Sequence, residues 1–476
     1  MGRFGEGTRL ERLNRAQWQG VETWLHPPYL ANGSLEWHTG TGKTYACHKV
    51  YGRFRIKFPA NEPENNIIVV VPSTKLKDDW ENPLTGHIVK WGLENIEVFV
   101  INTYITETRR CKLLIIDEIH RVLGEEADSF NKAIDITTCN FRLGLSATLT
   151  DEEKNTLRAK GMPVCHTITE EEAREEGFTS DYLEYNLAVN LNHIEKAEYE
   201  SYSKMFDKNK RYFVIDNRFD FKLMMQCTSN AHACLRVARY RGWSTSMGVD
   251  HADSPASIKK YANMCNKGMT MRKNILYNTK AKADVAEALI RKFSDMTIMT
   301  FSQTADMADE LTARLPDISR SYHTKVKSEI RDPKDAQTDM FGTLRTKKPK
   351  KIGADKVKEE SLMLFSSKAI RVLNAVKALD EGYDLPIINM SIILAASSKI
   401  RQQKQRKGRS TRFDEDDEEK KSVIINLYVP ETQDEVWLKE RQSTSKNIIW
   451  ADNINDIGNE QHIEGEDFNI ASSEPY

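Results

Sequence analysis

The stretch that decides the fold is S-L-E-W-H-T-G-T-G-K-T at residues 34–44, which opens a helical pattern. Gly40 and Gly42 allow the backbone to turn its N–H groups onto phosphate oxygens. Lys43 can reach the β- and γ-phosphates of a nucleotide, and Thr44 can hold Mg²⁺ through its hydroxyl. These residues predict a phosphate-binding loop that leads into a helix.

One position departs from the usual pattern of such loops. The first glycine of G-x-x-x-x-G-K-T falls at Trp37, which lacks the backbone freedom of glycine. A chance turn ahead of a helix is therefore the alternative interpretation of the loop taken alone.

A second motif further along the chain decides between these interpretations. Residues 113–116 form an apolar strand pattern that ends in Asp117-Glu118-Ile119-His120. Carboxylates at the C-terminal end of a buried strand lie at the rim where α/β sheets bind ligands. There Asp117 can bind the water shell of Mg²⁺, and Glu118 can orient and deprotonate an attacking water. A helix start with acids at its positive end is the alternative, and the phosphate loop upstream argues against it.

The composition indicates a folded protein of several domains. A chain of 476 residues is too long for one hydrophobic core and predicts two to four domains. Hydrophobic residues make up 39% and charged residues 29%, which excludes a mostly disordered or fibrous polypeptide. The net charge of −1 argues only weakly against a nucleic-acid partner, because residues 399–412 carry seven Lys or Arg and no acid.

Short apolar runs predict the architecture. Runs typical of buried parallel strands occur at 67–71, 98–101, 113–116, 143–145, 296–301, 369–373, 387–395 and 423–429. Between 192 and 289 such runs are missing and apolar residues recur at helical spacing. We expect an α/β fold of two parallel-sheet domains with a mostly helical insertion.

The sequence predicts an intracellular, cytoplasmic protein without a membrane partner. It contains no apolar stretch long enough to span a bilayer, and its N-terminus lacks the apolar core of a signal peptide. The seven cysteines are scattered without a C-x-x-C pair, so we interpret them as reduced thiols, most of them in the core.

The order of the motifs resembles that of superfamily 2 helicases over roughly residues 10–441. D-E-I-H at 117–120 and S-A-T at 146–148 are similar to motifs II and III of that family. Q-R-K-G-R-S-T-R at 405–412 is similar to its motif VI, Q-x-x-G-R-x-x-R. Further similar segments are 13–21 ahead of the loop, 69–80 and 100–104 (motifs Ia and Ib), 297–311, and 372–386 (motif V).

The resemblance implies a domain plan. It consists of an N-terminal RecA-like ATP-binding domain (1–180), a linker strand with the helical insertion (181–290), a C-terminal RecA-like helicase domain (291–450) containing a basic loop (323–360), and an acidic flexible tail (451–476).

It also implies the cofactors ATP and Mg²⁺ and a set of site residues. The nucleotide-binding residues are Gln17, Thr39, Gly40, Thr41, Gly42, Lys43, Thr44, Gly382 and Asp384. The catalytic residues are Glu118, Gln405, Arg409 and Arg412, the coupling residues are His120, Ser146 and Thr148, and the metal-binding residues are Thr44 and Asp117.

Motif VI separates a motor from a passive nucleotide binder. Arg409 and Arg412 lie three residues apart and so share a helix face, and guanidinium groups aimed at a γ-phosphate stabilise the transferring phosphoryl group. The alternative is a solvated basic patch that the six acids at 414–419 neutralise.

The resemblance implies an ATP-dependent helicase or translocase acting on nucleic acid, which we expect to be single-stranded, forked or branched DNA. Replication or recombination proteins are the expected partners. Similarity is strongest to phage-encoded DNA helicases and their restriction-subunit and branch-migration relatives, and a phage-encoded chain would act in the host cytoplasm. The alternatives are an RNA helicase, a restriction-type motor subunit, and a nucleotide-gated scaffold without turnover.

Lysines at 347–351 are either solvated surface or contacts to phosphates.

Overall fold

The computed structural model describes residues 3–123, 132–243, 245, 253–331, 337–338, 344–345, 350–376, 387–396, 400–413, 420–442 and 448–458. Contacts divide the chain into two compact units. The first comprises Met1–Leu183, Leu379–Asn389 and Ile400–Val423; the second comprises Glu184–Ala378, Met390–Lys399 and Ile424–Tyr476.

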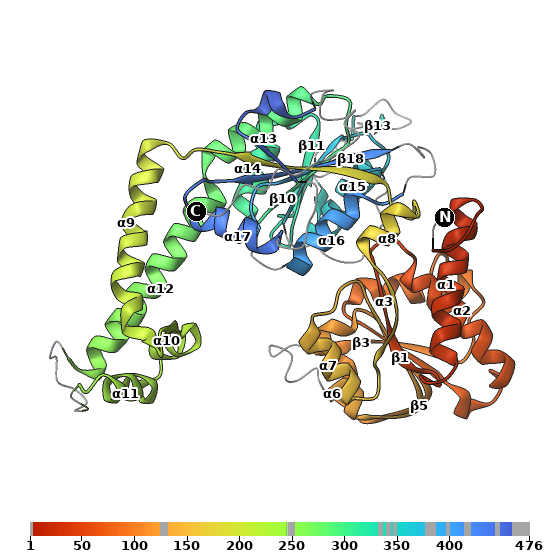
Figure 1. Ribbon diagram of the computed structural model, residues 1–476. Helices are drawn as coiled ribbons and strands as arrows, with labels where there is room; N and C mark the ends of the chain where they lie inside the picture. The colour runs from red at the N-terminus through yellow and green to blue at the C-terminus, as the bar shows by residue number, and fades with distance from the viewer. Residues whose placement is uncertain are drawn as a thin grey trace. The chain divides into compact units, whose positions relative to one another are not determined.

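A six-stranded parallel sheet forms the centre of the first unit (Figure 1). Its strands are β1 (Asn32–Trp37), β2 (Ile67–Val71), β3 (Ile96–Val100), β4 (Arg109–Ile116), β5 (Thr137–Ser146) and β6 (Val164–Ile168), in the order β3-β2-β4-β5-β1-β6. All five residues of β2 are buried, as its unbroken Ile-Val run predicts.

Helices cover both faces of this sheet. They are α1 (Arg9–Leu25), α2 (Lys43–Lys57), α3 (Thr74–Glu81), α4 (His87–Lys90), α5 (Ile101–Tyr104), α6 (Lys132–Asp135), α7 (Asp151–Ala159) and α8 (Glu170–Glu175), with 3-10 turns at Pro63–Asn65 and Ile119–Val122. Residues of α1 and α2 pack in one apolar cluster against the sheet, and residues of α5, α6 and α7 pack in another. The carboxyl ends of β1 and β4 therefore open onto the loops that carry the predicted site.

A seven-stranded sheet with parallel pairs combines β7 with six strands from the second half of the chain. Its strands are β7 (Asp181–Ala188), β10 (Ile298–Ser302), β11 (Ser319–Tyr322), β16 (Val372–Val376), β17 (Met390–Ile393), β18 (Lys421–Tyr428) and β19 (Ile448–Ala451), in the order β11-β16-β10-β17-β18-β7-β19. The accompanying helices are α13 (Lys280–Lys292), α14 (Ala305–Arg314), α15 (Ala354–Ser366) and α17 (Gln433–Arg441), with a 3-10 turn at Ile454–Asp456. Helix α16 (Ile400–Ser410) belongs to the first unit. The predicted class, two parallel-sheet α/β domains, is confirmed.

The helical insertion is also confirmed, and it forms an arm of the second unit (Figure 1). Its elements are α9 (His193–Lys210), β8 (Val214–Ile215), β9 (Arg218–Phe219), α10 (Phe221–Cys227), α11 (Ala231–Tyr240) and α12 (Pro255–Asn278). The long helices α9 and α12 run side by side, and α10 and α11 lie at the far end of the pair.

Parts of the predicted domain plan fall outside the described residues. Of the predicted basic loop, β12 (Glu329–Arg331) pairs with β15 (Lys350–Ile352) and β13 (Gln337–Thr338) with β14 (Leu344–Arg345), both antiparallel. Lys347 and Lys348 lie outside the described residues, as does the predicted tail beyond residue 458. The predicted domain boundaries stay a prediction.

Candidate nucleotide-binding site

The phosphate-binding loop joins β1 to α2, as predicted. Gly40 and Gly42 have φ values of 89° and 77°, in the left-handed region that favours glycine. A Cβ atom on Gly42 would clash with the side-chain amide of Gln17. That amide donates a hydrogen bond to the carbonyl oxygen of Thr41 (3.0 Å), so Gln17 of α1 fixes the shape of the loop.

Trp37 has a structural role. It is fully buried, and its indole Nε1 donates to His166 Nδ1 at 3.0 Å. Gly20 of α1 leaves the space for this ring, because a Cβ there would collide with it. The departure from the glycine pattern therefore packs α1 on the sheet and leaves Gly40 and Gly42 to form the turn.

Lys43 is the first residue of α2 and lies close to the acidic motif. Its Nζ donates to the carbonyl oxygen of Trp37 at 3.2 Å. Burial lowers the pKa of Lys43, and the charges of Glu118 and Asp117 oppose that shift. Asp117 also acts on the pKa of Cys47, one turn after Lys43 on α2. The structure thus brings the lysine, the first turn of α2 and both carboxylates together.

Asp117 and Glu118 follow the last residue of β4. The Asp117 N–H donates to the carbonyl oxygen of Val70 on β2 (2.9 Å), which continues the strand pairing up to the site. Glu118 has a φ of 49°, an uncommon conformation for a non-glycine residue that concentrates at functional sites. The backbone at this point directs two adjacent carboxylates to the same end of the sheet.

The two carboxylates differ in pKa. Burial, together with the charge of Glu118, raises the pKa of Asp117 to about 7 in the absence of a metal. Burial also acts to raise the pKa of Glu118, but the hydrogen bond from His120 and the charge of Lys43 outweigh it and lower that pKa to about 2. Glu118 is therefore the ionised member of the pair, in the state that a general base requires.

Glu118, His120 and Ser146 form a chain of short contacts. Its Oε2 lies 3.3 Å from Nδ1 of His120, and the same nitrogen lies 3.1 Å from Oγ of Ser146 at the end of β5. The Ser146 hydroxyl also contacts the backbone of Thr148, 3.1 Å from its carbonyl oxygen and 3.3 Å from its amide nitrogen. Among the predicted coupling residues, His120 therefore contacts both the predicted base and Ser146, and Ser146 contacts Thr148.

Helix α16 belongs to the first unit and carries Gln405 and Arg409 of motif VI. It ends at Ser410, so Arg412 lies beyond it, and the expectation that Arg409 and Arg412 share a helix face is wrong. Arg401 donates to both carboxylate oxygens of Glu153 at 2.7 and 2.6 Å. A Cβ on Gly408 would lie 2.7 Å from Cβ of Thr39, so the helix approaches the phosphate loop closely. The charge of Arg412 contributes to lowering the pKa of Lys43.

The remaining predicted residues take the following places. Arg409 is buried and Gln405 partly buried, both on α16, and Thr44 lies in the first turn of α2. Gly382 and Asp384 lie outside the described residues.

Sequence reasoning missed an ionic cluster beside the loop. Lys407 of α16 lies 2.8 Å from Glu170 of α8, and Tyr182 donates to the same carboxylate at 2.7 Å. Burial acts to raise the pKa of Glu170, but the charges of Lys407 and His38 outweigh it and lower that pKa to about 2. Burial lowers the pKa of His38 to about 4. Lys407 lies within motif VI and could be found from the sequence, whereas no motif or spacing marks Glu170.

Two further observations bear on other classes of site. No helix among the described residues combines the length and apolarity needed to cross a membrane. All seven cysteines are free thiols, and five of them are buried.

The fold, two parallel-sheet α/β domains with a phosphate-binding loop, is of the kind found in helicases. The family model for the helicase conserved C-terminal domain matches residues 353–414. The chain is similar in sequence to a curated DNA translocase, and its fold is similar to that of solved helicases.

One curated relative and two solved structures illustrate the similarity. The DNA 3'-5' translocase XPB2 of Sulfurisphaera tokodaii is 22% identical over 439 residues, covering 89% of this chain and 82% of the relative. The Saccharomyces cerevisiae Dbp5 structure bound to RNA and ADP BeF3 superposes with a TM-score of 0.54 at 12% identity, covering 94% of each chain. The Pyrococcus furiosus Hef helicase domain gives a TM-score of 0.51 at 13% identity, covering 91% of this chain and 97% of that one.

Proposed function

We propose that this chain is an ATP-dependent DNA helicase or translocase. The observation that carries the proposal is the grouping of the phosphate loop with the acidic motif and with motif III. The charges of Asp117 and Glu118 act on Lys43, and Glu118 contacts His120, which contacts Ser146. A passive nucleotide binder needs the loop, but it does not need an ionised carboxylate connected to a second motif.

In this proposal the residues of the loop and of β4 perform the hydrolysis. The loop N–H groups and Lys43 bind the β- and γ-phosphates. Glu118 orients the attacking water and accepts its proton, since its low pKa keeps it ionised. His120 holds the Glu118 carboxylate in place.

The donor set also fits Mg²⁺. The Thr44 hydroxyl and the Asp117 carboxylate supply oxygen ligands of the kind that this hard cation prefers, and Asp117 acts electrostatically on Lys43 and Cys47 of α2. A bound Mg²⁺ would neutralise charge on the phosphates and favour the ionised form of Asp117.

Arg409 and Arg412 are proposed to stabilise the transferring phosphoryl group. The approach of α16 to Thr39 and the effect of Arg412 on Lys43 support this role. Gln405, Gly382 and Asp384 stay proposed nucleotide-site residues.

DNA is the proposed substrate, in single-stranded, forked or branched form. The name of the XPB2 relative, a DNA translocase aligned over most of both chains, supports DNA. The RNA in the Dbp5 structure makes an RNA helicase the second candidate. We further propose replication or recombination proteins as partners, and action in the cytoplasm, or in the host cytoplasm if the chain is phage-encoded.

Replacement of the proposed base tests the mechanism. Glu118→Gln keeps the shape of the side chain but removes its ability to accept a proton. We expect the variant to bind ATP with unchanged affinity and to lose turnover by about 100-fold or more, the usual size of a general-base contribution. Fluorescent ATP-analogue binding and steady-state phosphate release measure the two quantities.

The matched control is Glu97→Gln, which removes an exposed carboxylate from β3 of the same unit. It should hydrolyse ATP like the parent. If Glu118→Gln also turned over ATP at the parental rate, the role given to Glu118 would be wrong.

A further inference from the structure

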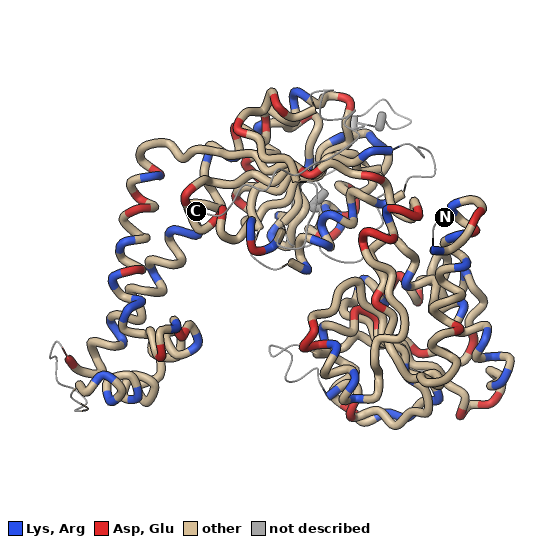
Figure 2. Tube along the Cα trace, viewed as in Figure 1, with Lys and Arg blue, Asp and Glu red and all other residues tan. Residues whose placement is uncertain are grey.

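The helical arm differs in charge from the rest of the chain. Residues 193–278 contain fifteen Lys or Arg and eight Asp or Glu, a formal charge of +7. Because the whole chain has a net charge of −1, all other residues together carry −8. Figure 2 shows Lys and Arg positions along the long helices and at the end of the arm. An acidic protein with one strongly basic projection is electrostatically suited to bind a polyanion through that projection.

The excess of basic over acidic residues is most pronounced on α12. This helix of 24 residues carries five Lys or Arg and no Asp or Glu. Lys259, Lys260 and Lys267 are exposed and surround Asn263 and Met264 in a shallow hollow on one helix face. We call these five residues the α12 basic face. Within the described part of the chain, no carboxylate forms an ion pair with its three lysines.

The arm is a packed body that holds this face in place. It has its own apolar core, which includes Phe206, Met224, Val237 and Ile258. At Gly268 the helices α9 and α12 come so close that an added Cβ would lie 2.8 Å from the backbone nitrogen of Phe206. A rigid surface loses little conformational entropy when it binds a rigid partner.

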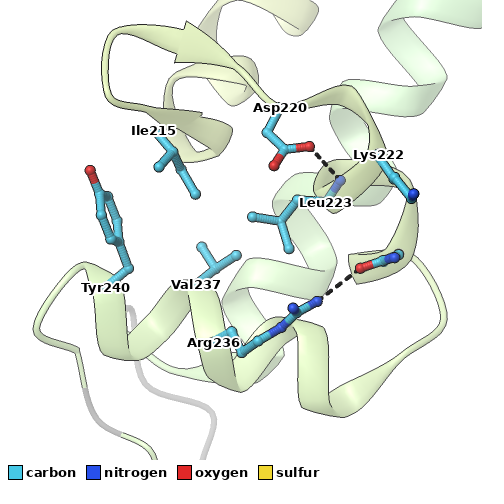
Figure 3. Close-up of a pocket in the computed structure, with 8 residues that line it drawn as sticks. Ile215, Asp220, Lys222, Leu223, Arg236, Val237 and Tyr240 are labelled. Atoms are coloured by element: carbon cyan, nitrogen blue, oxygen red, sulfur yellow. Dashed lines mark hydrogen bonds between the residues drawn. The ribbon is translucent and has the colours of Figure 1, made fainter.

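The helices at the end of the arm are basic as well. A second hollow there is lined by Ile215, Leu223 and Val237, with Lys222, Arg236 and Tyr240 at its edge (Figure 3). The one acid among the described residues that line it, Asp220, accepts a hydrogen bond from the Leu223 N–H at 2.8 Å and so caps α10. Helices α10 and α11 carry Lys222, Arg236 and Arg239 and no Asp or Glu.

We propose that the α12 basic face binds the phosphate backbone of duplex DNA, as a second contact beside the motor itself. The proposal rests on the proposed DNA motor function for its choice of polyanion. Lys260 and Lys267 lie seven residues apart on one helix face, about 11 Å along the axis, which corresponds to about three base-pair steps. Lysine is suited to phosphate contacts of this kind because it acts as a point charge without base specificity.

Duplex DNA fits this face better than a single strand. Sites for single strands combine basic grooves with aromatic rings on which bases stack. Tyr261, next to Lys260 on α12, already stacks on Tyr212 at a centroid distance of 4.1 Å and an interplanar angle of 9°. The α12 basic face itself consists of three lysines, Asn263 and Met264 and has no aromatic ring for a base to stack on.

Charge removal tests the proposal. The variant combines Lys259→Gln, Lys260→Gln and Lys267→Gln, which keeps long side chains of good helix propensity. The control combines Lys57→Gln, Lys280→Gln and Lys356→Gln, three exposed lysines on α2, α13 and α15. Affinity for a labelled blunt duplex is measured without nucleotide from about 50 to 200 mM salt, next to ATPase activity with and without DNA.

We expect the arm variant to bind the duplex roughly ten-fold more weakly at about 0.1 M salt, with a log–log salt slope smaller by about one per lysine that meets a phosphate. The control should keep a salt slope closer to that of the parent, and ATPase activity without DNA should be unchanged in both. Equal duplex affinity and slope in the arm and control variants would overturn the proposal. Weaker binding confined to single-stranded DNA would also overturn it.

Other outcomes separate this proposal from the proposed function. If the parent chain failed to hydrolyse ATP while the arm variant still lost duplex affinity, the motor function would fail and the arm proposal would stand. Loss of binding to polyglutamate with unchanged duplex affinity would assign the face to an acidic protein partner instead.

Discussion

Ser146 connects two motifs through a single hydroxyl. It contacts His120 at 3.1 Å and the backbone of Thr148, and its side chain is fully buried. Neither contact reaches a predicted phosphate-binding residue directly. We propose that Ser146 transmits a change at Thr148 to Glu118 through His120 and takes no part in the hydrolysis step itself.

Ser146→Ala should lower the stimulation of ATP hydrolysis by DNA while leaving hydrolysis without DNA nearly unchanged. A net hydrogen bond is worth about 1 kcal/mol, so stimulation should fall by about five-fold. The measurement is steady-state ATPase at saturating ATP, with and without DNA. Ser366→Ala, which removes an exposed hydroxyl from α15, is the control. A proportional fall of both rates would make Ser146 part of the hydrolytic site itself.

Short motifs allowed the sequence to predict where the phosphate loop and the acidic residues lie, whereas the roles of these residues stay predictions. Gly40, Gly42 and Lys43 form the expected loop, and Asp117 and Glu118 end a buried strand as expected. Glu170 could not be predicted, since its role depends on a pairing with Lys407 that lies more than 200 residues further along the chain. The relative pKa values of Asp117 and Glu118 depend on burial and on His120, which a motif does not specify.

Elements with polar residues inside the sheet were harder to predict than apolar runs. Strand β1 was not among the predicted runs because its buried residues include Ser34 and Glu36. Glu36 is compensated by the Leu149 N–H at 2.9 Å and by Lys154 at 2.8 Å. Strand β16 begins at Val372, although the apolar pattern was expected to form a strand from residue 369. Burial of paired polar groups, which only tertiary contacts create, accounts for the missed strand.

Two glycines inside helices should respond oppositely to replacement by alanine. In Gly268→Ala the new Cβ would lie 2.8 Å from the backbone nitrogen and 2.9 Å from the carbonyl oxygen of residues in α9, which forces the arm helices apart. We expect this variant to destabilise the arm by about 1–3 kcal/mol. Amide hydrogen exchange in α9 and α12, together with urea unfolding, measures the effect.

Gly52→Ala is the matched control on α2. A Cβ at Gly52 meets no atom within 4 Å, so the better helix propensity of alanine should stabilise the chain by up to about 1 kcal/mol. Unchanged exchange protection of the arm in Gly268→Ala would contradict the close packing of α9 on α12.

At the scale of the whole molecule, the order of apolar runs along the sequence predicts the two parallel sheets and the insertion. One group of runs indicates the first sheet, the segment without such runs indicates the insertion, and the later group indicates the second sheet. The charge separation between the arm and the rest of the chain was hidden by the net charge of −1, because opposite charges cancel in the sum. The basic residues of α10, α11 and α12 lie on one body, because these helices share an apolar core that the sequence alone does not specify.

ATP hydrolysis measured side by side without nucleic acid, with single-stranded, duplex and forked DNA, and with RNA of equal length tests the central claim most directly. The account predicts that DNA stimulates hydrolysis more than RNA does. It also predicts that stimulation varies little with base sequence and falls steeply from about 50 to 200 mM salt, because phosphate contacts dominate binding. Stronger stimulation by RNA than by every form of DNA, or a rate that no nucleic acid changes, would contradict it.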